Sequence, residues 1–279
     1  MAFVTRFAPS PTGPLHLGHA YSAILAHDMA RAAGGRFLLR MEDTDLERSS
    51  PHNAAGIVND LTWLGITWDG PILYQSDRIA YHNARIDPLA KCGLLYPCSC
   101  TRSDIRAALS APQEGVTFNV YPGTCRGRSM ALRQPGDALR LNLGAAFARF
   151  RAADLRFDET GPRDQGQHQI DPMIARSRIG DVVLSRKGEN IVAYFLAAAL
   201  DDADQAVSHV VRGEDLFEFT AVQVILQQLL GLPTPIYHHH RLIRDDQGKR
   251  LAKRDDARAL SKYRSDGASP DDIRAMIGL

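Results

Sequence analysis

The N-terminal string RFAPSPTGPLHLGH, residues 6–19, joins a predicted strand to a predicted helix through a turn rich in proline and glycine. The strand covers residues 2–7. Two histidines, His16 and His19, together with Gly18, open a helix that continues to about residue 33. A helix that starts directly after a tight turn presents free backbone N–H groups and the positive end of its dipole. Phosphate is the usual ligand of such a site, and the histidines add donors that stabilise charge on a leaving phosphate.

This string resembles the HIGH signature of the class I aminoacyl-tRNA synthetases, and its flanking residues resemble the glutamyl/glutaminyl branch of that family. For the His-x-Gly-His residues alone, an ordinary proline-rich turn is the alternative. Two other nucleotide-binding classes are disfavoured, because the chain has no GxxxxGK[ST] loop and no GxGxxG after its first strand. The resemblance implies that His16, Gly18 and His19 bind ATP and that both histidines are catalytic.

Strands and helices alternate in the first part of the chain. The apolar run at residues 36–41 predicts a second strand, and residues 51–64 predict a helix with Pro51 in its first turn. This order is typical of a parallel sheet, whose ligands bind at the carboxyl ends of the strands. With the resemblance, we expect an α/β fold: a Rossmann-type parallel sheet split by a zinc-containing insertion, with a short helical stem-contact region at the end.

The α/β rhythm is interrupted and then resumes. Cysteines and turn residues mark the middle of the chain, after which strands are predicted at residues 206–212 and 235–243 with a helix at 216–230 between them. We therefore divide the chain into a first catalytic half at 1–76, an acceptor-binding-like insertion at 77–189, a second catalytic half at 190–243, and a loop and tail at 244–279.

A second motif of the same family follows the last predicted strand. The sequence RLAKR, Arg250 to Arg254, resembles a divergent KMSKS loop. Lys253 matches the lysine whose ammonium group reaches the triphosphate as charge builds on pyrophosphate, and Arg250 replaces the first lysine. The resemblance implies that Arg250 and Lys253 bind ATP and that Lys253 is catalytic.

The resemblance also implies a glutamate pocket. Its first part would be the end of the first strand and the turn after it, namely Arg6, Phe7, Ala8, Pro9 and Ser10. The Arg6 guanidinium would make a bidentate contact with a carboxylate, and Glu42 would bind the ammonium group. Tyr194 and Arg212 match the remaining contacts of the family. The alternatives are core packing for Tyr194 and an ion pair with Glu214 or Asp215 for Arg212.

The cysteine pattern indicates a metal site. Cys98 and Cys100 are separated by one residue, and Cys125 follows the turn that begins at Tyr121. Thiolates suit Zn²⁺ in a closed tetrahedral site. Cys92 is a candidate for the fourth ligand on chemical grounds, whereas the resemblance implies Tyr121 and one structural zinc per chain. Free thiols are the alternative.

Only a short tail follows Arg254, too short for the anticodon-binding domain that continues full-length glutamyl- and glutaminyl-tRNA synthetases. The chain therefore resembles truncated paralogues in which ATP activates glutamate and the glutamyl group passes to the queuosine base in the tRNA(Asp) anticodon. The implied partners are L-glutamate, ATP with Mg²⁺ as substrate, and the tRNA(Asp) anticodon stem-loop. Two alternatives remain: a truncated glutamyl-tRNA synthetase that charges a tRNA 3′ end, and a non-catalytic tRNA-binding paralogue.

The net charge of +1 gives the chain no general attraction to polyanions, so phosphate contacts would come from local basic clusters. One cluster spans residues 241–254, and the other consists of Arg126, Arg128, Arg133 and Arg140. A solvated surface is the alternative for the second cluster. The sequence has neither a signal peptide nor an apolar run long enough to span a membrane. We expect a monomeric cytoplasmic enzyme.

Overall fold

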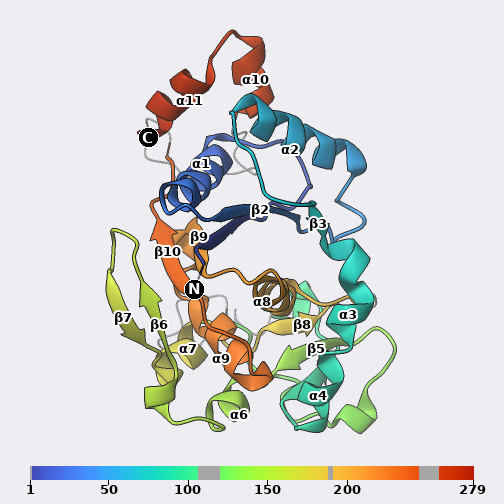
Figure 1. The fold of residues 1–279 in the computed structure, drawn as a ribbon. Coiled ribbons are helices and arrows are strands. Elements are labelled where there is room, and N and C mark those ends of the chain that lie inside the picture. The colour runs from blue at the N-terminus through green and yellow to red at the C-terminus, as the bar shows by residue number, and fades with distance from the viewer. Residues whose placement is uncertain (1, 106–119, 188–190, 245–257) are drawn as a thin grey trace.

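The computed structural model describes residues 2–105, 120–187, 191–244 and 258–279 (Figure 1). The strands are β1 (Val4–Phe7), β2 (Arg36–Met41), β3 (Leu73–Tyr74), β4 (Leu95–Cys98), β5 (Ala138–Leu141), β6 (Arg156–Glu159), β7 (Gly166–Gln169), β8 (Val183–Ser185), β9 (His209–Gly213) and β10 (Ile236–His240). The α-helices are α1 (Leu17–Ala32), α2 (Pro51–Trp63), α3 (Ile79–Asn83), α4 (Ile86–Lys91), α6 (Leu143–Phe147), α7 (Pro172–Arg178), α8 (Tyr194–Asp204), α9 (Thr220–Leu230), α10 (Leu260–Ser265) and α11 (Pro270–Ile277).

Parallel strands form the centre of the fold in two adjoining sheets (Figure 1). The first has the order β1-β2-β3, with parallel pairing throughout. The second has the order β7-β6-β10-β9, in which β10 runs parallel to both β9 and β6. The two sheets meet where β1 lies beside the start of β9, and the Ser208 N–H there donates to the Val4 carbonyl at 3.0 Å. The predicted α/β fold with a parallel sheet is confirmed.

The segment predicted as an insertion consists of two different pieces. Strands β4, β5 and β8 form a separate antiparallel sheet. Strands β6 and β7 form an antiparallel hairpin instead, and β6 pairs in parallel with β10 through Glu159 and Tyr237. The predicted insertion therefore also extends the edge of the central sheet, so one of its side chains can reach the interior of the catalytic half.

Helices cover both faces of the β1-β2-β3 sheet: α1 and α2 lie on one face and α8 on the other (Figure 1). The alternation of β2 follows from this arrangement, because successive side chains of a strand point to opposite faces. Phe37 and Leu39 are buried among apolar residues of α1 and α2, whereas Leu38 belongs to the cluster that includes Leu196 of α8. Arg40 follows on the Leu38 face and is completely buried, so its charge needs a partner there.

Local signals set the ends of the helices near the site. Ser50 accepts the Asn53 N–H at 3.1 Å and caps α2, with Pro51 as its first residue. Helix α9 ends at Gly231, whose φ of 64° lies in the left-handed region that glycine adopts at little cost. The predicted helix at 216–230 starts later than expected, at Thr220, because a short 3-10 turn, η4 (Glu214–Leu216), comes first.

Candidate active site

The N-terminus of α1 carries the two histidines of the predicted phosphate site. His16 precedes the helix, and its Nδ1 accepts the Gly18 N–H at 3.1 Å. Nδ1 of His19 accepts the His16 N–H at 3.2 Å, and the two ring centroids lie 3.7 Å apart. Since Nδ1 accepts in both rings, the proton of each neutral imidazole is on Nε2. The turn therefore fixes both histidines as Nε2–H donors at the positive end of a helix.

A cavity of about 550 Å³ opens at this helix start. It lies at the carboxyl ends of β1, β2, β9 and β10, where ligands of parallel sheets are expected. Every described residue that the sequence assigns to ATP or glutamate lines this cavity, namely Arg6, Phe7, Ala8, Pro9, Ser10, His16, Gly18, His19, Glu42, Tyr194 and Arg212. Arg250 and Lys253 lie outside the described residues. The fold thus brings parts of both catalytic halves to one cavity.

Arg6 reaches the cavity already paired. Its Nε and Nη2 donate to the two carboxylate oxygens of Asp202 at 2.9 and 3.3 Å. This differs from the expected bidentate contact between Arg6 and a ligand, because Asp202 occupies that edge of the guanidinium. Asp202 also accepts from Nη1 of Arg40 at 2.8 Å. Burial raises the pKa of Asp202, but the charges and hydrogen bonds of Arg6 and Arg40 hold this pKa below its ordinary value.

Glu42 completes this buried group at the carboxyl end of β2. Its side chain is 10 % exposed and lies 3.4 Å from Nη2 of Arg40. Burial raises the pKa of Glu42 above its ordinary value, although Arg40 and Arg6 oppose the shift. An ammonium group entering the cavity would lower that pKa again, because an adjacent cation favours the charged carboxylate. Glu42 is therefore suited to bind a ligand ammonium.

Arg212 is held by neutral acceptors. Its Nε donates to Nε2 of His239 at 2.9 Å, and its Nη1 donates to the side-chain oxygen of Gln223. Its Nη2 donates to the Thr220 hydroxyl at 2.7 Å and to the Leu216 carbonyl at 3.2 Å. Arg212 is 6 % exposed. A buried cation with only neutral acceptors creates a strong preference for an anion in the cavity that it lines.

The alternative contacts of Arg212 and Tyr194 can now be compared with the structure. Among the described residues, no ion pair joins Arg212 to Glu214 or Asp215, and Glu214 pairs with Arg163 at 3.4 Å. Tyr194 is the first residue of α8 and lines the cavity, although its ring also packs edge-on against Phe195 at 5.3 Å. Burial raises the pKa of Tyr194, so its hydroxyl is a neutral group.

Sequence reasoning missed a histidine in the wall of the cavity. Nδ1 of His240 lies 2.8 Å from the Arg241 carbonyl, so this nitrogen carries the proton. The other nitrogen, Nε2, then accepts the Ser22 hydroxyl at 2.6 Å. Burial lowers the pKa of His240, which agrees with a neutral ring. The run His238–His240 marked this strand end, but nothing in the local pattern indicated which of its rings face the cavity.

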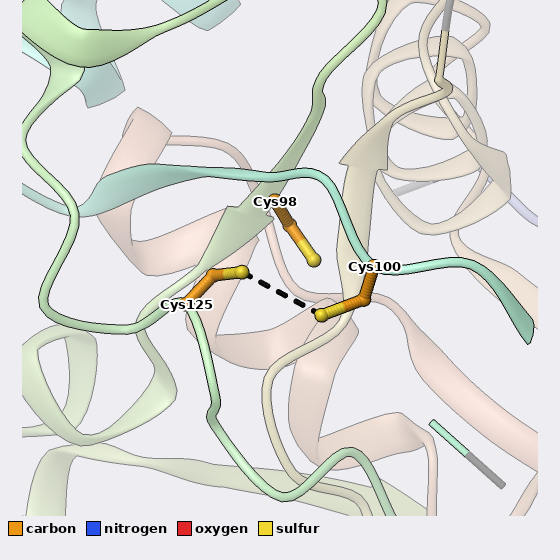
Figure 2. Close-up of side chains that lie close together, drawn as sticks. All are labelled: Cys98, Cys100 and Cys125. Atoms are coloured by element: carbon orange, nitrogen blue, oxygen red, sulfur yellow. Dashed lines mark hydrogen bonds between the residues drawn. The ribbon is translucent and has the colours of Figure 1, made fainter. Parts of the chain in front are cut away.

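Three of the predicted metal ligands, Cys98, Cys100 and Cys125, lie close together (Figure 2), and none of them lines this cavity. The sulfur atoms of Cys98, Cys100 and Cys125 all lie within 4.8 Å of one another, and Cys100 and Cys125 are 3.5 Å apart. The Tyr121 hydroxyl lies 3.5 Å from Cys98 Sγ and 3.7 Å from Cys100 Sγ. Zn–S bonds of about 2.3 Å give sulfur–sulfur distances of about 3.8 Å in a tetrahedral site. The donor set therefore fits a metal ion.

The electrostatics of the cluster also favour a cation. Burial raises the pKa of the Cys100 thiol to about 11. Burial also raises the pKa of the Cys125 thiol, but hydrogen bonds from Tyr121 and the Ser99 backbone lower this pKa to about 6. Three adjacent thiolates repel one another, so a bound cation is needed to keep all of them deprotonated. Cys92 is exposed at the end of α4 and does not belong to the cluster.

In the basic cluster of Arg126, Arg128, Arg133 and Arg140, three of the arginines have internal partners. Arg140 is 9 % exposed, donates to Cys98 Sγ at 3.3 Å, and lies 3.8 Å above the Tyr121 ring. Arg126 pairs with buried Asp181 at 2.6 Å, and Arg128 pairs with Asp137 at 3.0 Å. Internal acceptors thus bind Arg126, Arg128 and Arg140, and Arg140 supports the cysteine cluster.

The comparisons with known proteins agree with this geometry. Residues 2–279 match the family of class I tRNA synthetases (E and Q), catalytic domain. A Rhodobacter capsulatus protein named glutamyl-Q tRNA(Asp) synthetase is 58 % identical over 283 residues, which cover 99 % of this chain and 100 % of that protein. A Nocardia farcinica protein of the same name is 42 % identical over 274 residues, 98 % of this chain and 82 % of that protein.

Solved structures show the same fold. A glutamate-tRNA synthetase from Elizabethkingia anophelis aligns with a TM-score of 0.78 at 24 % identity. A glutamate tRNA ligase from Elizabethkingia meningosepticum, in complex with its amino acid, aligns with a TM-score of 0.77 at 25 % identity. Each alignment covers 100 % of this chain but only 61 % of the other.

Within the described residues, no helix has the length and apolar character needed to cross a membrane.

Proposed function

The chain belongs to the class I tRNA synthetases of the glutamyl and glutaminyl branch, and on this premise we propose that it is an ATP-dependent glutamyl-queuosine tRNA(Asp) synthetase. It activates L-glutamate to glutamyl-adenylate and transfers the glutamyl group to the queuosine base at the wobble position of the tRNA(Asp) anticodon. The observation that carries the proposal is the single cavity in which an anion-binding helix start, a carboxylate and an arginine with neutral partners meet. Similarity over the full length of the Rhodobacter capsulatus protein of that name supports the acceptor.

The first step is an in-line displacement at phosphorus. An α-carboxylate oxygen of glutamate attacks the α-phosphorus of ATP, the new O–P bond forms, and pyrophosphate leaves with the electron pair of the broken bond. Positioning and charge stabilisation account for most of the catalysis in such a reaction. The Nε2–H groups of His16 and His19 donate to phosphate oxygens at the start of α1. Mg²⁺ enters with ATP as part of the substrate.

The second step transfers the acyl group. A hydroxyl of the queuosine cyclopentenediol attacks the glutamyl carbonyl, AMP leaves with the electron pair of the broken C–O bond, and the hydroxyl proton passes to solvent. No Ser, Cys or His of this chain forms a covalent intermediate in this scheme. The RNA is an anticodon stem-loop, a short A-form stem that ends in unpaired nucleotides and is recognised mainly by shape and backbone. Its phosphate contacts come from the basic segment 241–254 and from the cluster at 126–140, where Arg126 and Arg128 stay partly exposed.

Glutamate selection follows from the charges in the cavity. Glu42 binds the ammonium, Tyr194 and residues 6–10 line the pocket, and Arg212 binds a carboxylate. Glutamine would place an amide beside Arg212 and leave that cation without its anion. We expect glutamate-dependent ATP–pyrophosphate exchange without tRNA. The kcat/KM for glutamine should be at least about 10- to 100-fold lower than that for glutamate. Comparable exchange with both amino acids would contradict the proposed pocket.

The cysteine cluster belongs to the same proposal as a structural zinc site. Cys98, Cys100, Cys125 and Tyr121 hold one Zn²⁺ per chain, which ties β4 to the turn after Tyr121. Two contacts support the tyrosine as a ligand: its oxygen accepts the Cys125 N–H at 2.8 Å, and Arg140 lies over its ring. Burial raises the pKa of the Tyr121 hydroxyl, while these two contacts favour the phenolate and a bound cation would lower that pKa.

Metal content tests this ligand set directly. We expect about one zinc per wild-type chain by mass spectrometry of the dialysed protein, and loss of zinc from Cys125→Ser. Tyr121→Phe should retain zinc at the start but release it faster to a chelator. Cys92→Ser is the matched control, because it removes an exposed thiol outside the cluster and should leave the zinc content unchanged. Zinc loss from Cys92→Ser, with full retention in Tyr121→Phe, would refute the assignment.

A further inference from the structure

A buried carboxylate of the hairpin β6–β7 connects through His239 to Arg212, which lines the candidate active site. Glu159 ends β6 and is 2 % exposed. Its Oε1 accepts the backbone N–H groups of Gly161 at 2.5 Å and of His239 at 2.9 Å, and its Oε2 accepts the ring Nδ1–H of His239. A Cβ on Gly161 would lie 2.2 Å from the His239 carbonyl oxygen, so the close approach of the two strands requires glycine there. The carboxylate is thus enclosed on every side by partners.

The Glu159 carboxylate fixes the state of the His239 ring. Burial raises the pKa of Glu159, but the hydrogen bonds from the His239 ring and two backbone N–H groups lower it to about 2. The carboxylate is therefore ionised at neutral pH. Burial lowers the pKa of His239, with Arg212 acting in the same direction and Glu159 in the opposite one. The ring is therefore neutral with its proton on Nδ1, and Nε2 accepts the Arg212 Nε–H at 2.9 Å.

The hydrogen bonds from Glu159 through His239 to Arg212 determine which N–H groups of Arg212 remain for a ligand. A guanidinium has five N–H donors. His239 and Gln223 each accept one, and Thr220 and Leu216 accept the pair on Nη2. The remaining donor is on Nη1, and Arg212 lines the cavity. If the ring of His239 carried its proton on Nε2, two N–H groups would face each other and the guanidinium would turn away.

We propose that Glu159 and His239 are positioning residues that aim Arg212 at the carboxylate of the amino-acid substrate. They touch no substrate, so the hairpin β6–β7 contributes to amino-acid selection from outside the cavity. The inference rests on the proposed function, because it takes the ligand carboxylate of that proposal as the target of Arg212. It adds a specificity element from a segment that the sequence analysis had assigned to the insertion.

The substitution Glu159→Gln isolates the proton position. The amide oxygen still accepts the backbone N–H groups, but the amide N–H₂ now faces Nδ1 of His239 and drives the ring proton to Nε2, against Arg212. We expect KM for glutamate in ATP–pyrophosphate exchange to rise about tenfold or more, with KM for ATP changed by less than about twofold. Asp158→Asn is the matched control, since Asp158 is exposed on the same strand and accepts a side-chain N–H of Gln167 at 3.1 Å.

A second pair of variants tests the same chain at His239. In His239→Gln, the amide oxygen accepts the Arg212 Nε–H and the amide nitrogen donates to Glu159, so most glutamate affinity should remain. His239→Met has a similar length without an acceptor of that strength and should show the raised KM for glutamate. Circular dichroism checks that each variant is folded. If Glu159→Gln does not fold, the two His239 variants test the proposal instead.

Additivity separates positioning from general stability. In an Arg212→Lys background, Glu159→Gln should change KM for glutamate by less than about twofold, because the residue through which it acts is already altered. Fully additive effects would overturn the inference, as would equal glutamate KM values for wild type and Glu159→Gln or for His239→Gln and His239→Met. A wild-type protein without glutamate-dependent exchange would overturn the proposed function itself, and this inference with it.

Discussion

tRNA from cells that cannot make queuosine will accept no measurable glutamate from this protein, whereas tRNA(Asp) that contains queuosine will accept about one glutamate per molecule. The reason is chemical. The activated carbonyl needs a hydroxyl as nucleophile, and an unmodified guanine at the wobble position offers none, while the cyclopentenediol of queuosine does. The measurement is incorporation of labelled glutamate with ATP and each tRNA preparation, followed by release of the label in mild alkali, as expected for an ester.

The control separates the anticodon from the 3′ end. Queuosine-containing tRNA(Asp) that lacks its terminal adenosine should remain a full substrate, and so should an isolated anticodon stem-loop with queuosine. Binding of the stem-loop should weaken steeply with salt, because phosphate contacts release counterions. If queuosine-free tRNA is glutamylated and removal of its terminal adenosine abolishes the product, the protein is a charging enzyme that acts on the 3′ end.

The parts of the site that local patterns determine were predictable from the sequence. The string at residues 6–19 specifies a strand, a turn and a helix start, and the structure has β1, the turn and α1 there. The alternation of Phe37, Leu38 and Leu39 likewise reflects a strand buried on both faces. In such cases the residues that determine the conformation are close neighbours in the chain, so periodicity and turn chemistry are sufficient.

Side-chain partners from distant elements were not predictable. Arg6 pairs with Asp202, which lies 196 positions away, and Glu159 meets His239, 80 positions away. Both pairs depend on how α8 and β6 are placed against the central strands, and no local pattern encodes that placement. The same limit explains Arg140, which looked like part of a basic surface until β5 placed it against Cys98.

Lys253→Ala will lower the rate of glutamate-dependent ATP–pyrophosphate exchange by about 100-fold or more, the range for losing one charged contact made in the transition state. Charge builds on the pyrophosphate oxygens as the bond to the α-phosphorus breaks. We expect His16 and His19 to supply neutral Nε2–H donors there, because Nδ1 of each ring accepts a backbone N–H. Among the described residues that line the cavity, the arginines are Arg6, which is paired with Asp202, and Arg212, which is assigned to the glutamate carboxylate.

We therefore expect Lys253 to supply a cation for the leaving pyrophosphate beside the Mg²⁺ that enters with ATP, and to act only when that charge develops. Because the contact is made in the transition state, kcat should fall while KM for glutamate stays within about twofold. Lys262→Ala is the matched control: it removes an exposed lysine of α10 whose Nζ lies 2.8 Å from Asp266, and its exchange rate should equal that of the wild type. An unchanged kcat in Lys253→Ala would show that residues 250–254 are not the KMSKS loop of this enzyme, and a raised KM for ATP alone would limit Lys253 to ground-state binding.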